Sequence, residues 1–250
     1  MIYFLGAGPG APDLITVRGR ELLRRAHTVV YAGSLINPLL LKETPSGCQL
    51  YNSAGLTLGE VVEILHRAQG PGRTVIRLHS GDPSLYGAIR EQMDALAKLG
   101  LAFEVVPGVS SLGAVAAALG IEYTVPGVSQ TVILTRLAGR TPVPVGEEVN
   151  SLAAHGASMV FFLSSDMLSE LCLRLEEGGY PAETPAALVY KASWPEEKVV
   201  RGTIETLPQL GQEANINSTA LVVVGNCLGD NYELSRLYAA DFTHSFRPAP

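Results

Sequence analysis

The chain has 250 residues, of which 47% are hydrophobic and 17% are charged, and its formal net charge is −6. Because affinity for nucleic acid comes from clustered lysine and arginine, this acidic balance argues against a nucleic-acid partner, while it leaves room for a small anionic ligand. No apolar run approaches the roughly 20 residues of a membrane span, and the N-terminus lacks a signal-peptide pattern, so we expect a cytoplasmic protein without membrane association.

The first half of the chain alternates between strand and helix patterns. An apolar run at 2–8 ends in glycines, a helical stripe follows it, and a β-branched run occupies Thr28–Tyr31. The alternation continues with helices at 58–70, 88–100 and 112–120, and with strand-and-loop units at 74–87 and 102–111. This order predicts parallel strand pairs in an open α/β sheet.

The second half repeats the alternation after a new strand at 131–136. Three later strands are continuous apolar runs, as expected where both faces of a strand are covered: Met159–Leu163, Ala186–Tyr190 and Ala220–Gly225. Residues 198–204 resemble an antiparallel excursion. We therefore predict two α/β domains with mostly parallel open sheets, residues 1–117 and 118–229, followed by an extended tail at 230–250.

The stretch GAGPGA after the first strand matches the dinucleotide pattern G-x-G-x-x-[GA] with Gly6, Gly8 and Ala11. A dinucleotide site needs free backbone N–H groups at the start of a helix, and Pro9 and Pro12 have none. The acidic residue that binds the ribose about 20 positions onward is also missing. Two interpretations remain: a loop that approaches a ligand other than a pyrophosphate, and a strand–turn–helix loop without a ligand.

Two further loops follow strands of the same predicted sheet, at the carboxyl ends where open α/β sheets bind ligands. In the first loop, Asp82 either accepts from a ribose hydroxyl or an ammonium group of a ligand, or caps the following helix. In the second loop, Ser110 or Ser111 is the natural N-cap of a helix of small residues, which can approach a ligand closely.

Loops in the second half carry cations. Arg136 and Arg140 lie in a loop rich in glycine and proline, and Lys191 and Lys198 flank the only tryptophan, Trp194. Such residues are usually solvated loop charges, but together they suit a flat, polycarboxylated ligand. The three cysteines have neither paired nor metal-ligand spacing, so we expect no disulfide and no metal site in the protein.

Six segments, in this order, resemble the signatures of the tetrapyrrole methyltransferases: LGAGPGAPDLITVRG, HSGDPSLYG, VPGVSS, ILTRLAGRTPVP, FFLSS and VYKASWPEEKVVRGT. The resemblance spans essentially the whole chain. It implies an enzyme that transfers a methyl group from S-adenosylmethionine to a tetrapyrrole and releases S-adenosylhomocysteine. The position implied is C11 of precorrin-4, or of its cobalt form, in cobalamin biosynthesis. The resemblance also implies a homodimer of two-domain subunits with the cofactor in the cleft between the domains.

The cofactor contacts that the resemblance implies are Pro9, Ser80, Gly81, Asp82, Leu85, Ser110, Ser111, Leu163, Ala192, Thr219 and Ala220. Leu163 stands where the family often has methionine, a change that preserves an apolar contact. We expect Arg136, Arg140 and Lys191 to bind the peripheral carboxylates of the ring, because charge-assisted contacts orient such a ligand. No residue is assigned as a catalytic base, and any cobalt would arrive with the substrate.

Two other functions stay open. The first is another reaction of the same family, with uroporphyrinogen III, C17 of precorrin-3 or RNA as the target of methylation. The acidic composition of the chain argues against RNA. The other is a module that binds a tetrapyrrole without catalysis, although the Gly-Asp-Pro and Pro-Gly-Val-Ser loops favour an enzyme.

Overall fold

The computed structural model describes residues 1–243 and 245–247, and the chain divides into two compact units. Unit 1 comprises Met1–Val115 and Lys191–Glu197, and unit 2 comprises Ala116–Tyr190 and the chain from Lys198 onward. This division differs from the expected limits of 1–117 and 118–229. Residues 191–197 pack with unit 1, although the chain on both sides of them belongs to unit 2.

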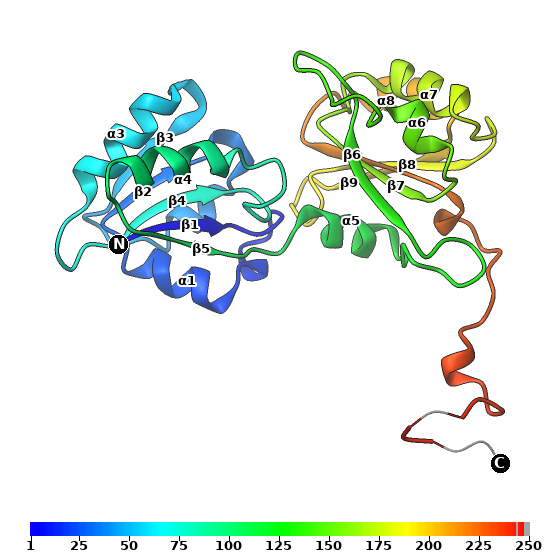
Figure 1. The fold of residues 1–250 in the computed structure, drawn as a ribbon, viewed down its shortest axis with the longest axis horizontal. Coiled ribbons are helices and arrows are strands. Elements are labelled where there is room, and N and C mark those ends of the chain that lie inside the picture. The colour runs from blue at the N-terminus through cyan, green and yellow to red at the C-terminus, as the bar shows by residue number, and fades with distance from the viewer. Residues whose placement is uncertain (244, 248–250) are drawn as a thin grey trace. The chain divides into compact units, whose positions relative to one another are not determined.

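Unit 1 contains a five-stranded sheet in the order β3-β2-β4-β1-β5, in which all neighbours are parallel (Figure 1). Its strands are β1 (Ile2–Gly6), β2 (Thr28–Tyr31), β3 (Gln49–Asn52), β4 (Val75–His79) and β5 (Phe103–Val106). The predicted parallel sheet is therefore confirmed in this unit. Strand β3 has no counterpart among the predicted elements, because its four residues are all exposed and form no apolar pattern.

Helices cover both faces of this sheet (Figure 1). Helix α1 (Val17–Arg24) packs on one face, where Leu5 and Leu22 share a core cluster. Helices α3 (Leu58–Ala68) and α4 (Ile89–Lys98) pack on the other face, where Phe4, Leu65 and Leu96 form a second cluster. The short helix α2 (Pro38–Leu41) precedes β3, and the division between the units falls within α5 (Ser111–Leu119).

Unit 2 contains a second five-stranded sheet, in the order β6-β7-β10-β8-β9. Its strands are β6 (Val132–Arg136), β7 (Ser158–Phe162), β8 (Pro185–Tyr190), β9 (Lys198–Thr203) and β10 (Ala220–Val224). Strands β6 and β7 are parallel, whereas the β7–β10, β10–β8 and β8–β9 pairs are antiparallel. The prediction of a mostly parallel sheet is wrong for this unit, and the predicted antiparallel excursion is confirmed as β9.

The error has a physical cause. Continuous apolar runs report that both faces of a strand are buried, and they carry no information on strand direction. Direction follows from the connections, because parallel neighbours need a crossover of about a dozen residues or more. The segment 191–197 between β8 and β9 is too short for such a crossover, which accounts for the antiparallel pair that was predicted. The pairs that were not predicted involve β10, which is the last strand in the chain but lies between β7 and β8, an order that no local pattern shows.

Three helices pack against the sheet of unit 2: α6 (Val149–Ala153), α7 (Leu168–Glu177) and α8 (Leu207–Glu213). They share a core with the strands that includes Phe161, Leu171, Leu188 and Leu207. The sequence pattern does not predict α8, because this helix buries little more than one leucine and one glycine. In the part of the chain that the structure describes, no helix combines the length and the apolar composition needed to cross a bilayer.

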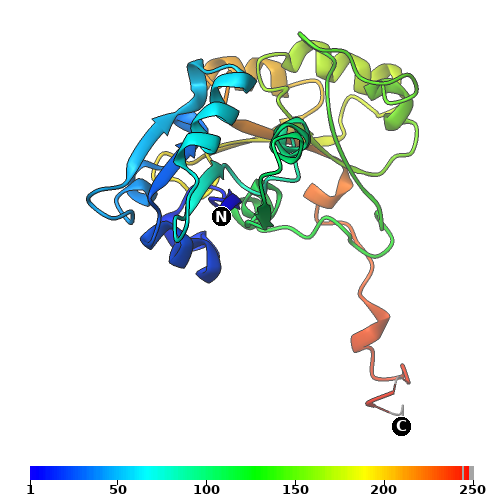
Figure 2. The same ribbon diagram turned by 60° about the vertical axis from the view of Figure 1, so that its left-hand side comes forward.

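The chain after β10 forms two short 3-10 turns, Asn226–Leu228 and Arg236–Tyr238. Figures 1 and 2 draw this segment, in orange to red, without a strand arrow. Glu233 N donates to Pro126 O (3.1 Å), which fastens the segment to unit 2. The predicted extended tail at 230–250 includes residues 244 and 248–250, which lie outside the described residues.

Candidate functional site

Three loops of unit 1 meet through glycines at the carboxyl edge of its sheet. Gly6 ends β1, Gly81 lies in the loop after β4, and Gly108 lies in the loop after β5. A Cβ atom on Gly6 would lie 2.5 Å from Gly108 Cα and 2.6 Å from Gly81 O. A Cβ atom on Gly108 would lie 2.7 Å from Gly6 Cα and closer still to Gly81 O. The three backbones can approach this closely only because these residues lack side chains, and we call the contact the glycine junction.

Backbone hydrogen bonds join two of these loops. Gly8 N donates to Gly81 O (3.3 Å) and Gly81 N donates to Gly8 O (2.8 Å), which makes one antiparallel bridge beyond the sheet. Both glycines have left-handed φ values, 80° for Gly8 and 60° for Gly81, where an L side chain would be strained. Pro9 and Ser80, two of the predicted cofactor contacts, therefore lie on adjoining loops.

Asp82 ties the loop after β4 to the loop after β5. Its Oδ2 accepts from Gly108 N (2.8 Å), and its Oδ1 accepts from Ser84 N (2.8 Å) and from the Ser84 hydroxyl. Burial by itself raises the pKa of Asp82, but the hydrogen bonds from Ser84 and Gly108 outweigh it and lower the pKa below its ordinary value. The side chain is therefore a carboxylate at neutral pH, and both of its oxygens already accept from donors of the protein.

The start of α5 lies on the third loop. Ser110 Oγ accepts from Leu112 N (3.2 Å), which confirms the predicted cap of this helix. The side chains of Ser80, Leu85, Ser110 and Ser111 are half-buried. One edge of the sheet in unit 1 thus gathers the loops that carry seven predicted cofactor contacts: Pro9, Ser80, Gly81, Asp82, Leu85, Ser110 and Ser111.

Residues 191–197, which we call the strap, pack on the loop after β1. Trp194 Nε1 donates to Pro9 O (3.0 Å), and Ala11 N donates to Ser193 Oγ (3.0 Å). A Cβ atom on Gly10 would lie 2.8 Å from Trp194 Cγ and closer still to other atoms of the indole ring. The strap and the loop therefore fit each other only with glycine at position 10.

The strap also carries two predicted site residues. Ala192 is buried. The Lys191 ammonium lies 5.0 Å from the centroid of the Trp194 ring and 4.0 Å from Glu196 Oε2. Because the strap belongs to unit 1, Lys191 and Ala192 are held by the same unit as Pro9.

One edge of the sheet in unit 2 gathers the other predicted residues. Arg136 pairs in register with Phe162 at the ends of β6 and β7, and Leu163 follows directly. The register between β10 and β7, carried to the strand ends, sets Ala220 opposite Leu163, and Thr219 precedes it. The Leu163 side chain is 64% exposed, which is unusual directly after a buried strand and suits an apolar ligand contact.

The two arginines of the loop after β6 have different surroundings. Arg136 donates to three carbonyl oxygens of its own loop: Leu137 O (3.2 Å), Thr141 O (3.1 Å) and Pro142 O (2.6 Å). Arg140 is exposed, and its guanidinium has no partner among the described residues. Arg136 therefore shapes the loop, and Arg140 is the better placed of the two to bind a carboxylate from solution.

Backbone strain is concentrated in the same segments. Seven non-glycine residues of the described chain have positive φ values, and three are predicted site residues: Leu163 (52°), Lys191 (46°) and Thr219 (53°). Three more lie in the loop after β4 and in the strap, at Tyr86, Ala88 and Ser193. Left-handed conformations cost free energy for residues other than glycine, and they collect at functional sites.

His79 is unsuited to carry a proton. The side chain is 4% exposed and stacks on Phe4. Burial, with a smaller effect from the Arg77 charge, lowers the pKa of His79 to about 3, so the imidazole is neutral at physiological pH. No residue is therefore assigned as a base. No group of three or more His, Cys, Asp and Glu within residues 1–243 and 245–247 could hold a metal ion.

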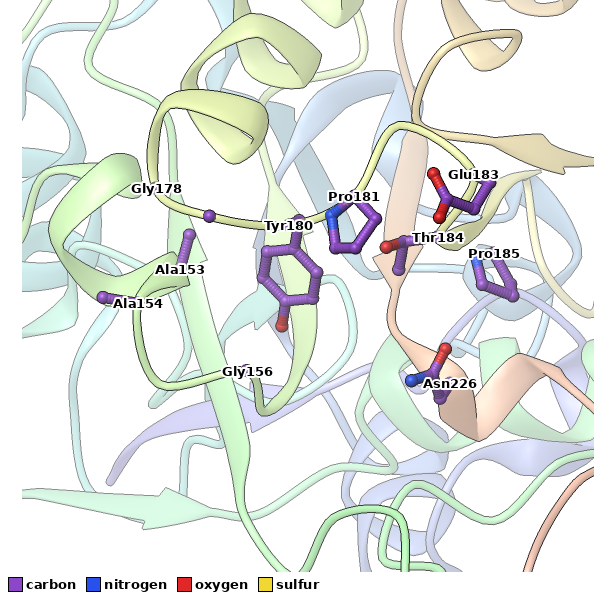
Figure 3. A pocket seen from close by; sticks show the side chains of 11 residues that line it. Ala153, Ala154, Gly156, Gly178, Tyr180, Pro181, Glu183, Thr184, Pro185 and Asn226 are labelled. Atoms are coloured by element: carbon purple, nitrogen blue, oxygen red, sulfur yellow. The ribbon is translucent and has the colours of Figure 1, made fainter.

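A hollow of about 510 Å³ lies at the other edge of the sheet in unit 2, where β7 and β8 begin and β10 ends (Figure 3). Figure 3 shows Tyr180, Pro181 and Pro185 along it, with Asn226 after β10. Glu183 is the one charged residue of its lining, so the hollow lacks cations for a polycarboxylated ligand. It contains none of the predicted site residues.

Sequence reasoning did not assign the glycine junction or the strap contacts. The signal that could have indicated the junction is a glycine at or just after the end of three strands. These are Gly6 at the end of β1, Gly81 after β4 and Gly108 after β5. No local signal could have paired Trp194 with Pro9, which are 185 positions apart.

Comparison with known proteins gives one consistent family. Residues 1–208 match the family described as Tetrapyrrole (Corrin/Porphyrin) Methylases. The cobalt-precorrin-4 C(11)-methyltransferase of Methanocaldococcus jannaschii is 46% identical over 247 residues, 98% of this chain and 95% of the relative.

Two solved structures resemble this one over most of the chain. The X-ray structure of a cobalt precorrin-4 methyltransferase, a cobalamin biosynthetic enzyme, has a TM-score of 0.89 at 42% identity, covering 92% of this chain and 96% of that one. The uroporphyrin-III C-methyl transferase of Thermus thermophilus complexed with S-adenosyl homocysteine has a TM-score of 0.76 at 26% identity, covering 91% and 98%.

Proposed function

The chain belongs to the tetrapyrrole (corrin/porphyrin) methylase family, and from this premise we propose that it methylates C11 of precorrin-4, or of its cobalt form, to give precorrin-5. S-adenosylmethionine is the methyl donor. The observation that carries the proposal is the likeness of nearly the whole chain, at 46% identity, to a relative named for this reaction. A relative that is 46% identical over 98% of this chain and 95% of its own length is expected to share the substrate class of this chain.

The loops of unit 1 suit the methyl donor chemically. Half-buried hydroxyls at Ser80, Ser110 and Ser111 can hydrogen-bond to ribose hydroxyls and to the amino-acid part of the molecule. Proposed apolar contacts are Leu85 and Ala192 of unit 1 and Leu163 and Ala220 of unit 2, and Thr219 directly precedes Ala220 in the chain. When bound, S-adenosylmethionine supplies an electrophilic methyl carbon on a sulfonium group.

The task of the protein is then to align the ring carbon behind that methyl group at attack distance. We assign Arg140 and Lys191 to the peripheral carboxylates of the ring, because charge-assisted bonds fix the orientation of a polyanion without discriminating between ring carbons. Arg136 assists through the loop that it holds. The chemistry demands little acid–base catalysis beyond removal of a proton from the ring.

Turnover under anaerobic conditions tests the proposal. The protein is incubated with S-adenosylmethionine and either precorrin-4 or cobalt-precorrin-4, and the product is analysed by mass spectrometry for one added methyl group at C11. Parallel incubations use uroporphyrinogen III and precorrin-3. Methylation of one of these instead of precorrin-4 would contradict the assigned substrate, and binding without turnover would indicate a non-catalytic module.

The proposal extends to a cytoplasmic homodimer, which the family resemblance implies. Light scattering coupled to size-exclusion chromatography measures the mass in solution, where a dimer has twice the 26.5 kDa of one chain. A mass of one chain at assay concentration would contradict the dimer and leave the proposed reaction untouched.

A further inference from the structure

A different hydrogen bond holds each residue of the loop 9–11, and two of the three come from the strap. Trp194 Nε1 donates to Pro9 O (3.0 Å), and Ala11 N donates to Ser193 Oγ (3.0 Å). The carbonyl between them, Gly10 O, accepts from the side chain of the buried Asn37 (2.9 Å). The loop that we propose to contact the cofactor is therefore not free to adjust by itself.

The indole ring fixes the loop by packing as well as by its N–H group. It lies where a side chain on Gly10 would be, since a Cβ atom there would come within 2.8 Å of Trp194 Cγ and nearer to the pyrrole ring atoms. The ring is also half-buried. A movement of Pro9 or Gly10 thus requires a movement of Trp194.

The same tryptophan sets the position of a cation. The Lys191 ammonium lies 5.0 Å from the Trp194 ring centroid, within the range of a cation–π interaction. Trp194 N donates to Lys191 O (2.9 Å), and Ser193 N donates to Glu197 Oε2 (2.6 Å). These bonds hold Lys191 and Ser193 in left-handed conformations, at φ 46° and 70°, that isolated residues of these types avoid.

We propose that Trp194 is a positioning residue that joins the Pro9 loop and the Lys191 ammonium into one arrangement, so that binding of the cofactor and of the polycarboxylated ring are coupled. The inference rests on the proposed function. Each ligand biases the same structural element, and coupling through such an element is reciprocal: each ligand raises the affinity of the other by the same factor.

Fluorescence offers a direct readout, because Trp194 is the only tryptophan of the chain. Addition of S-adenosylhomocysteine to the wild-type protein is expected to shift the emission saturably, with the same Kd as calorimetry. Emission that does not change while calorimetry records binding would overturn the proposal.

Calorimetry then measures the coupling. S-adenosylhomocysteine is titrated into the protein with and without uroporphyrin III, a polycarboxylated porphyrin that cannot be methylated in this assay. We expect the porphyrin to lower the Kd of the wild type by about fivefold or more. In Trp194→Phe, which keeps an aromatic ring but loses the N–H donor and the pyrrole part that packs against Gly10, the Kd should rise about two- to tenfold and the effect of the porphyrin should disappear.

Matched variants separate positioning from folding. Ser193→Ala removes only the acceptor of Ala11 N and should weaken the coupling, whereas Gly10→Ala forces the indole away and should abolish it. Gly59→Ala, in α3 with no atom within 4 Å of the added Cβ, should match the wild type. Thermal midpoints are measured for all variants, because a purely structural role would lower the midpoint and leave the coupling factor unchanged.

Failure of the two proposals can be told apart. A wild-type protein that does not bind S-adenosylhomocysteine would overturn the proposed function and this inference with it. A wild type that binds it, with Trp194→Phe and Ser193→Ala showing the same Kd and the same porphyrin effect, would overturn the inference alone.

Discussion

Replacing Asp82 with asparagine tests whether one carboxylate holds two loops of unit 1 together. Asparagine keeps the shape but has a single oxygen acceptor, so it can serve Gly108 N or the donors of Ser84, while its amide group faces the other N–H. A hydrogen bond to a charged group contributes about 1.5–3 kcal/mol, and partial exposure favours the lower end. We therefore expect D82N to lose about 1.5 kcal/mol of unfolding free energy and about tenfold in affinity for S-adenosylhomocysteine.

Urea denaturation followed by circular dichroism measures the first quantity, and calorimetry measures the second. Ser84→Ala is the matched control, because it removes the hydroxyl donor and leaves Ser84 N and Gly108 N bonded to the carboxylate. Its effect should be less than half that of D82N. An unfolding free energy and a Kd of D82N that both equal the wild-type values would refute the role of the carboxylate in shaping the loops.

The pH dependence of the difference in unfolding free energy between the wild type and D82N provides a second test. The folded-state pKa of Asp82 is lowered from its ordinary value of 3.8, so the stability that the carboxylate contributes is present above that value. It is lost as the pH falls through the folded-state pKa. The gap in stability between wild type and D82N should therefore narrow on acidification below 3.8, and a constant gap would contradict this reading.

Five other substitutions, at three places in the fold, are informative. Gly108→Ala should cost about 2–4 kcal/mol of unfolding free energy in urea, because its Cβ atom would overlap two backbones; Gly113→Ala, with open space around the added atom, should not destabilise. Arg140→Ala should raise KM for precorrin-4 and leave the thermal midpoint unchanged, whereas Arg136→Ala should raise KM and also lower the midpoint. Equal KM values for Arg140→Ala and the wild type would disprove the contact between Arg140 and the ring carboxylates. Hydrogen bonds from two arginines lower the pKa of Glu43 from 4.5 to about 2. The stability that the Glu43 carboxylate contributes is therefore present above pH 4.5 and is lost as the pH falls toward 2. Between these pH values the thermal midpoint of the wild type should fall more than the midpoint of Glu43→Gln.

The sequence predicted elements wherever burial leaves a pattern. Strands β1, β4, β7 and β10 are apolar runs bounded by glycine or polar residues, and they lie where the runs predict. Strand β3 and helix α8 were not predicted from the sequence. All four residues of β3 are exposed, and α8 buries only one side of its two turns. Strand direction in unit 2 was not predicted for a different reason: β10 comes last in the chain but lies between β7 and β8, and hydrophobicity does not encode that order.

The site shows the same boundary between local and long-range information. That Ser110 caps the helix after its strand follows from its position, and the structure confirms it. The alternative that Asp82 caps the following helix is wrong, because Asp82 accepts from Ser84 N in a turn and α4 begins only at Ile89, with Ala88 at its N-cap. That Asp82 also accepts from Gly108, and that Trp194 reaches Pro9, could not be predicted, since each contact joins loops that only the folded chain brings together. Comparison with relatives identifies the family, but the positions of these contacts come from the packing.

The loop after β1 shows how a matching pattern can lack the corresponding chemistry. A dinucleotide loop presents free N–H groups to a pyrophosphate. Here Gly8 N donates to Gly81 O and Ala11 N donates to Ser193 Oγ, while Pro9 has no N–H group. Gly6 allows three backbone segments to pack closely together, whereas in a dinucleotide loop the glycine makes room for a phosphate. The loop therefore lacks the row of free N–H groups that binds a pyrophosphate. Its carbonyl oxygens Gly8 O, Pro9 O and Gly10 O also accept hydrogen bonds from the protein, so what the loop offers a ligand is chiefly the shape of its surface.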